Sequence, residues 1–166
     1  ANAARRRTVV SIYEELLAAD PANEEYAQAV ASLYRKIGDD PGRDAWLIRR
    51  ARNTDLPAEI RSNALRTTAE EALAEAARDN EAGRREAAAT LAARARQRLD
   101  EAIAISPGSL ACHALRLHGV ELEVAIARAR RDAPRRTELE ALLSRARRTA
   151  DAVERAQRTS ERTDEY

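Results

Sequence analysis

The sequence predicts an all-α fold, because residues that favour helices fill the chain and residues that break them are rare. Only five Gly and five Pro occur in 166 residues, and most of them separate stretches rich in Ala, Leu, Glu and Arg. Within these stretches apolar residues recur three and four positions apart, as on one side of an amphipathic helix. The alternation of apolar and polar residues that marks a strand is almost missing. Composition and periodicity therefore both indicate helices joined by short turns.

The apolar content consists mainly of small and aliphatic side chains. Hydrophobic residues make up 44% of the chain and aromatic residues 3%, and neither Phe nor Met occurs. Contacts between helices are therefore expected to use Ala and Leu, which favours closely packed helices over a large ligand cavity. We expect one domain over residues 1–158 and a frayed tail over residues 159–166.

Charge and cysteine content exclude several classes of protein. The formal net charge is +1 although 34% of the residues are charged, so no overall field draws the chain to nucleic acid or to a membrane surface. No apolar run approaches the roughly 20 residues that a transmembrane helix needs. A single cysteine, Cys112, cannot form a disulfide within the chain. The compartment stays open.

The first two expected helices span residues 3–19 and 23–37. In each of them apolar residues follow one another at three-to-four spacing, so one side of the helix is apolar. Asp20 and Pro21 end the first helix, and Gly38 suits a left-handed end for the second. The apolar residues are Val9, Ile12, Tyr13, Leu16 and Leu17 in the first helix, and Tyr26, Val30, Leu33, Tyr34 and Ile37 in the second.

The next three expected helices span residues 43–52, 57–78 and 84–105. The third helix is short and carries Trp46. Asp55 and Pro57 indicate the start of the fourth helix, because a carboxylate and an early Pro suit the unpaired amides there. The stretch DNEAG at 79–83 forms the turn before the fifth helix. Both longer helices present Ala and Leu at helical spacing, which predicts close contacts.

The last two expected helices span residues 110–131 and 134–158. SPGS at 106–109 precedes the sixth helix, whose apolar residues occupy two faces, as in a helix between two neighbours. Thr137 and Glu140 have the spacing of a capping box for the seventh helix. The apolar residues of the seventh helix share one side, which is typical of a helix that covers the end of a domain.

The stretch DPANEEYAQAVASLYRKIGDD, residues 20–40, resembles the first helix of a tetratricopeptide (TPR) repeat. Such repeats have Pro before the unit, small residues where helices touch, a late aromatic residue, Gly at the turn and Ala early in the second helix. Pro21, Ala31, Tyr34, Gly38 and Ala45 take these places, and Pro57 closes the unit after two extra residues.

The resemblance covers residues 11–57 best. SIYEELLAADP at 11–21 resembles the second helix of a preceding repeat, and LDEAIAISPGS at 99–109 has a similar ending before Pro. The pattern departs from the family at Ala27, where a large aromatic residue is usual, and at Val30, where Leu is. The resemblance implies a TPR-like α-solenoid of antiparallel helical hairpins with a long C-terminal capping helix. The alternative is a compact helical bundle.

The resemblance also implies that a partner protein or peptide binds in a groove lined by first helices. Arg35 and Lys36 can meet a carboxylate of that partner. The alternative for each position is the solvated face of an amphipathic helix. The groove set, as we name the matching positions, consists of Glu25, Gln28, Ser32, Arg35 and Lys36.

Trp46 has two interpretations. The first is core packing, since it lies near most of the other aromatic residues. The second is an anchor for a partner, because Trp is over-represented where binding energy concentrates. We therefore add Trp46 to the candidate partner-binding residues.

Two further groups of residues could carry chemistry. Cys112, His113 and His118 do not share one helix face, and no second pair of ligands completes a zinc site, so we expect no metal and two half-exposed histidines. The second group surrounds the turn at RARRDAPRR and could contact phosphate, anionic lipid or an acidic partner. Because no aromatic residues accompany this group, we do not expect nucleic acid as the partner. This basic cluster consists of Arg128, Arg130, Arg131, Arg135 and Arg136.

The sequence contains no phosphate-binding loop, dinucleotide fingerprint or nucleophile elbow. We expect no enzyme activity, no cofactor and no small-molecule substrate. The expected function is that of a non-catalytic interaction or scaffold module. This module could be a subunit or a fragment of a larger assembly. The alternative is a structural or designed helical bundle without a ligand groove.

Overall fold

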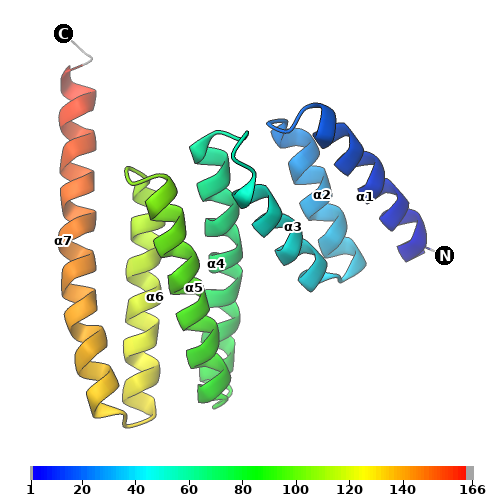
Figure 1. Cartoon of the computed structure of the whole chain (residues 1–166). Helices are drawn as coiled ribbons and strands as arrows, with labels where there is room; N and C mark the ends of the chain where they lie inside the picture. Colours follow the sequence, from blue (N-terminus) through cyan, green and yellow to red (C-terminus); the bar gives the residue numbers. More distant parts are fainter. Residues whose placement is uncertain (1, 164–166) are drawn as a thin grey trace. The chain divides into compact units, whose positions relative to one another are not determined.

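The computed structural model describes residues 2–163, and it is helical throughout this range apart from short turns (Figure 1). The prediction of an all-α fold is confirmed, and no strand occurs among the described residues. The helices are α1 (Asn2–Ala19), α2 (Glu24–Ile37), α3 (Asp40–Arg52), α4 (Ala58–Glu81), α5 (Arg85–Ile105), α6 (Leu110–Ala129) and α7 (Ala133–Thr163).

The contacts divide the chain into two compact units, of which the first ends at Ala64 and the second begins at Leu65. The boundary falls inside α4. The single domain over residues 1–158 and the solenoid arrangement stay predictions. Helix α7 continues to Thr163 within the expected tail 159–166, and residues 164–166 lie outside the described part of the chain.

The ends of α2 follow from two residues of its flanking turns. The Asn23 side chain accepts a hydrogen bond from the Tyr26 amide at 3.1 Å, which satisfies one unpaired donor of the first turn. Gly38 ends the helix with φ of 77°, and its amide donates to the carbonyl of Arg35. A side chain would strain this left-handed conformation, so the expected role of Gly38 is confirmed.

The starts of α3 and α7 differ from the sequence prediction. Helix α3 begins at Asp40 instead of residue 43, because the Asp39 side chain accepts from the Gly42 amide at 3.0 Å. The capping box predicted at Thr137 is wrong, since the Asp132 side chain caps α7 by accepting from the Arg135 amide at 3.1 Å. The Thr137 hydroxyl instead donates to the Ala133 carbonyl inside the helix.

In the first unit α2 packs against both α1 and α3. Val30 of α2 is fully buried, and the rings of Tyr13 and Tyr26 lie 5.8 Å apart at the contact between α1 and α2. Leu47 and Ala51 add buried surface from α3. This packing of three consecutive helices fixes the walls of the pocket described below.

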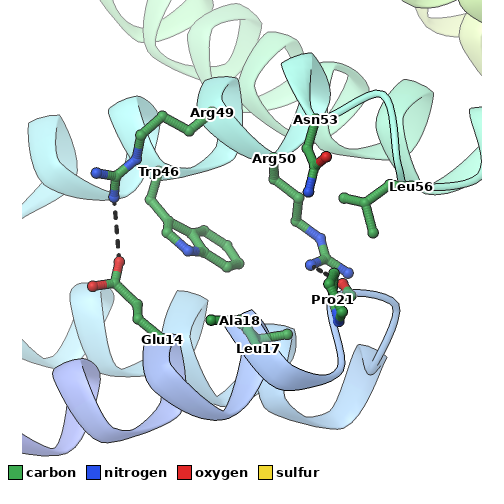
Figure 2. A pocket seen from close by; sticks show the side chains of 9 residues that line it. All are labelled: Glu14, Leu17, Ala18, Pro21, Trp46, Arg49, Arg50, Asn53 and Leu56. Carbon is green, nitrogen blue, oxygen red and sulfur yellow. Dashed lines mark hydrogen bonds and ion pairs between the residues drawn. The ribbon is translucent and has the colours of Figure 1, made fainter.

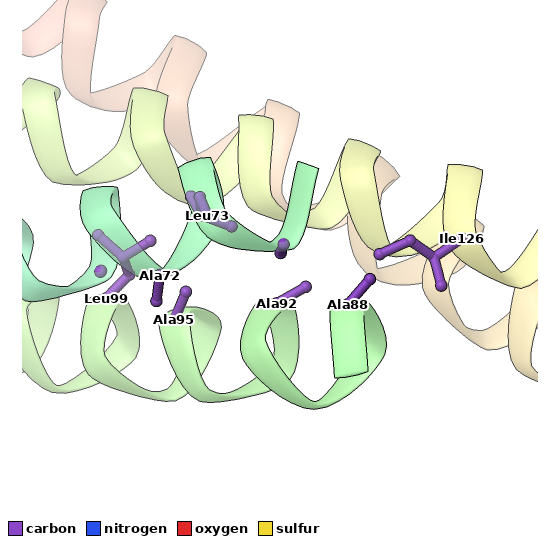
Figure 3. Close-up of a cluster of buried hydrophobic side chains, with 9 residues drawn as sticks. Ala72, Leu73, Ala88, Ala92, Ala95, Leu99 and Ile126 are labelled. Carbon is purple, nitrogen blue, oxygen red and sulfur yellow. The ribbon is translucent and has the colours of Figure 1, made fainter. Parts of the chain in front are cut away.

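In the second unit small side chains let α4, α5 and α6 approach closely. Ala88, Ala92 and Ala95 of α5 are fully buried and point toward Leu73 of α4 and Ile126 of α6 (Figure 3). The central glycine of α6, Gly119, has a Leu73 methyl group 3.3 Å from the place where its side chain would begin. The core cluster consists of Ala69, Ala72, Leu73, Ala76, Ala88, Ala92, Ala95, Leu99 and Ile126.

We expect Ala92→Leu to destabilise the chain by about 1–3 kcal/mol, because the larger side chain overpacks this contact. Ala104→Leu on the exposed side of α5 is the matched control, and we expect it to change stability by less than about 0.5 kcal/mol. Urea unfolding followed by circular dichroism measures both. An Ala92→Leu chain as stable as the control would contradict the close approach of these helices.

Candidate binding pocket

The structure places the groove set on one side of α2. Its members lie opposite the buried Val30, because residues three, four and seven apart share a helix face. Four of them are exposed and Ser32 is half-buried. The groove set therefore shares one face of α2, whereas the role of these residues in binding stays a prediction.

Trp46 lies apart from the groove set. It is 7% exposed and lines a pocket whose walls come from α1, α3 and the turns beside them, with no residue from α2. The candidate partner-binding residues are therefore divided between two surfaces. The pocket has a volume of about 340 Å³ and is lined by Glu14, Leu17, Ala18, Pro21, Trp46, Arg49, Arg50, Asn53 and Leu56 (Figure 2).

Arg50 holds one wall of the pocket in place. Its Nη1 donates to the Pro21 carbonyl at 2.9 Å, and its Nη2 lies 2.6 Å from the Glu24 carboxylate. The guanidinium also lies 6.0 Å from the centre of the Trp46 ring, within the range of a cation–π contact. The Arg50 side chain is only 8% exposed. Together with its contacts to Pro21 and Glu24, this burial makes Arg50 part of the packing between α3 and the α1–α2 turn.

Arg49 has the opposite character. Its side chain is 70% exposed and its Nη2 lies 3.3 Å from Oε1 of Glu14 across the pocket. An ion pair as exposed as this one is worth at most about 1 kcal/mol. A carboxylate brought by a ligand can therefore replace Glu14 at Arg49 with little loss.

The pocket combines apolar surface with one replaceable ion pair. Leu17, Trp46 and Leu56 form the apolar part of its lining. Most of each of these three residues is buried in the fold. The lining residues include no Ser, Cys or His, so the pocket offers no nucleophile activated by a base. Its chemistry suits reversible binding of an apolar group with a neighbouring carboxylate.

Cys112, His113 and His118 do not form a site. Cys112 is buried, and His113 is also buried, with Nε2 donating to the Pro107 carbonyl at 2.9 Å. The expectation of a half-exposed His113 is wrong, because this hydrogen bond satisfies the ring inside the protein. Among the residues that the structure describes, no group of three or more His, Cys, Asp or Glu could hold a metal ion.

Carboxylates surround the basic cluster. Arg128 lies 2.9 Å from Glu140, Arg130 lies 2.8 Å from Glu86, and Arg136 lies 3.8 Å from Glu140. Arg135 pairs with Glu138 at 3.0 Å and approaches the buried Glu123 at 3.6 Å. Arg131 has φ of 58° at the start of the turn. Intramolecular ion pairs therefore offset most of the charge that the sequence pattern concentrates here.

Sequence reasoning missed Arg49 and Glu14 as pocket residues. They lie 35 positions apart, and only the packing of α1 and α3 against α2 brings them together. The available signal was the position of Arg49 three residues after Trp46, on the same side of α3.

Comparisons with models of protein families, with curated proteins and with solved structures gave no match. The TPR resemblance therefore rests on the residues quoted above. Within the described range, none of the helices has both the length and the apolar character needed to cross a membrane.

Tyr34 gives a pH-dependent test of the contact between α1 and α2. Burial, with a further contribution from the Glu14 carboxylate, raises the pKa of Tyr34 above its ordinary value of 10.0. The folded chain thus holds this proton more tightly than the unfolded chain. Its contribution to stability is complete below about pH 10 and is lost as the pH rises through the raised pKa.

We expect the Tyr34→Phe chain to lose stability less steeply than the natural chain above about pH 10. Ultraviolet absorbance follows the ionisation of tyrosine in both chains as the pH rises. Subtracting the Tyr34→Phe curve from the curve of the natural chain leaves the titration of Tyr34, whose midpoint is its pKa. A difference curve with its midpoint at or below the ordinary value would contradict the structure.

Two glutamates of α6 test the ion pairs beside the basic cluster. Glu123 is buried and accepts from Arg96 at 2.8 Å, whereas Glu121 is exposed and accepts from Arg147 at 2.8 Å. We expect Glu123→Gln to cost about 2–3 kcal/mol, because it leaves buried polar groups imperfectly paired. The matched Glu121→Gln change should cost less than about 1 kcal/mol. Equal losses in urea unfolding would rule out a special role for the buried pair.

Proposed function

We propose that this chain is a non-catalytic protein-interaction module that binds a segment of a partner protein in the pocket between α1 and α3. In this proposal the module is built from TPR-like helical hairpins and works as a scaffold, alone or within a larger assembly. The observation that carries the proposal is the presence of Trp46 and Arg49 in one open pocket. The partner segment places an apolar side chain beside Trp46 and an Asp or Glu carboxylate at Arg49.

Pre-ordering of the pocket supports this function. Arg50 fixes the turn at Pro21 and packs near the Trp46 ring, so binding immobilises few additional side chains. Little conformational entropy is then lost on binding, which favours affinity from a small contact. Trp is also the residue type most enriched among side chains that dominate binding energy.

The size of the pocket supports a protein segment over a free metabolite. A volume of about 340 Å³ lies at the lower end of the range for small-molecule sites, and here the hollow is open between two helices. It accommodates one or two side chains of a longer chain, whose flanking residues lie along α1 and α3. Arg49, at the rim, is the polar group that fixes the orientation of such a segment.

The groove set is a second candidate surface for the same function. Arg35 and Lys36 lie in the last turn of α2 and are both exposed. They could bind a carboxylate by the mode that the TPR resemblance implies. Charge reversal on each surface separates the two candidates.

A phage library of random linear peptides tests the proposal. We expect selection on this chain to enrich peptides with an apolar residue beside Asp or Glu. A synthetic copy of the enriched peptide should change the fluorescence of Trp46, the one Trp of the chain, on binding. Arg49→Glu should weaken that binding about tenfold or more, since a charge-assisted contact is replaced by repulsion.

Arg52→Glu is the matched control, because Arg52 is an exposed residue of α3 that does not line the pocket. It should leave the affinity within about twofold. Binding that is lost on Arg35→Glu with Lys36→Glu but kept on Arg49→Glu would transfer the site to the groove set. No enriched peptide at all would favour the purely structural bundle.

A further inference from the structure

Helix α1 carries an apolar stripe that the other described residues of the first unit leave exposed. Val9 is 37% exposed, Ile12 50% and Leu16 40%. Among the side chains that the structure describes, these are the large hydrophobic residues that stay exposed, and all belong to one helix. An exposed apolar patch concentrated in this way marks an interaction surface.

The stripe occupies a different side of α1 from the residues that pack within the first unit. Val10 and Leu17 supply the buried side that packs within the unit, and Glu14 and Ala18 face the pocket. Val9, Ile12 and Leu16 follow spacings of three and four residues, the pattern of a helix that pairs with another helix. The stripe is therefore separate from the proposed binding pocket.

The charges of α1 identify what kind of helix would fit. Arg5, Arg6 and Arg7 occupy its N-terminal part, and Glu14 and Glu15 occupy its C-terminal half. The first turn contains no acidic residue and the last turn no basic residue. This distribution opposes the helix dipole, which favours acidic residues at the N-terminus and basic residues at the C-terminus.

Arg5 and Glu15 take part in no ion pair with other described residues, although both are exposed and flank the stripe. A partner helix with the same charge distribution, running in the opposite direction, would supply the missing charges at both ends. A parallel copy would place arginine beside arginine and glutamate beside glutamate.

We propose that the stripe binds a second copy of this chain, with the two α1 helices antiparallel. When the helices overlap along their whole length, Asn2 is level with Ala19 of the second copy, and Arg6 is level with its Glu15. Val9 then faces Ile12 of the second copy, and Leu16 packs on the aliphatic stem of its Arg5. Arg5 of each chain comes within reach of Glu15 of the other.

The two-fold symmetry of this arrangement makes every contact occur twice. Each apolar and charged contact is therefore repeated at the opposite end of the interface. A pair of helices of this length makes a small interface, so association is weak and concentration-dependent. Pairing of two copies through α1 goes beyond the proposed function, because it requires no other protein and does not use the pocket.

Sedimentation equilibrium of the natural chain over the micromolar range tests the proposal. We expect reversible association from monomer to dimer. Ile12→Glu should keep the chain monomeric throughout that range, because it places a charge at the centre of the apolar contact. Since Ile12 is half exposed, the variant should keep the circular dichroism spectrum and thermal unfolding of the natural chain.

Charge reversal tests the antiparallel direction. Arg5→Glu and Glu15→Arg should each weaken the dimer about three- to tenfold, and the two changes together should restore it to within about twofold. Arg7→Glu is the matched control, because it makes the same charge change on the same helix away from the stripe. It should leave association within about twofold of the natural chain.

Three outcomes would overturn the proposal. The first is a natural chain that stays monomeric at every concentration. The second is a dimer that survives Ile12→Glu, which would place the interface elsewhere. The third is a double charge reversal that fails to restore association, since the antiparallel pairing requires that restoration.

Discussion

Close approach of helices through small side chains determines how the second unit packs. The fully buried alanines of α5 bring its backbone close to α4 and α6. A protein without Phe or Met has few large side chains to hold helices apart. The two proposals place binding in a surface hollow and on an exposed helix face. The pocket at Trp46 and the stripe on α1 are surfaces of these two kinds.

Local sequence signals predicted the helices well, but they misplaced the start of α3 and the cap of α7. Gly38 and Pro21 mark turns by their own backbone preferences, so no knowledge of the tertiary structure is needed to place them. Asp39 and Asp132 cap their helices a few residues earlier than predicted. Asp, Ser and Thr are all acceptable caps, and at α7 the Asp132 side chain accepts the cap hydrogen bond while the Thr137 hydroxyl donates within the helix.

The candidate site depended on contacts that a helical pattern does not encode. Periodicity grouped the groove set correctly on one face of α2, because that grouping is a property of the helix alone. It could not separate Trp46 from this set, since the separation arises from the packing of α3. Likewise, the basic cluster is evident in the sequence, whereas Glu86, which offsets Arg130, comes from another helix. Electrostatic environment is therefore a tertiary property here.

Helix α1 joins the two proposals, because it has three distinct sides. Val10 packs within the unit, Glu14, Leu17 and Ala18 border the pocket, and the stripe is exposed. Since the stripe and the pocket share no residue, α1 can pair with a second copy while the pocket stays open. A dimer would then present two identical pockets related by a two-fold axis, and a partner carrying two binding segments would gain affinity from their effective concentration. The weak affinity expected of a single small pocket is thus compatible with tight binding by the pair.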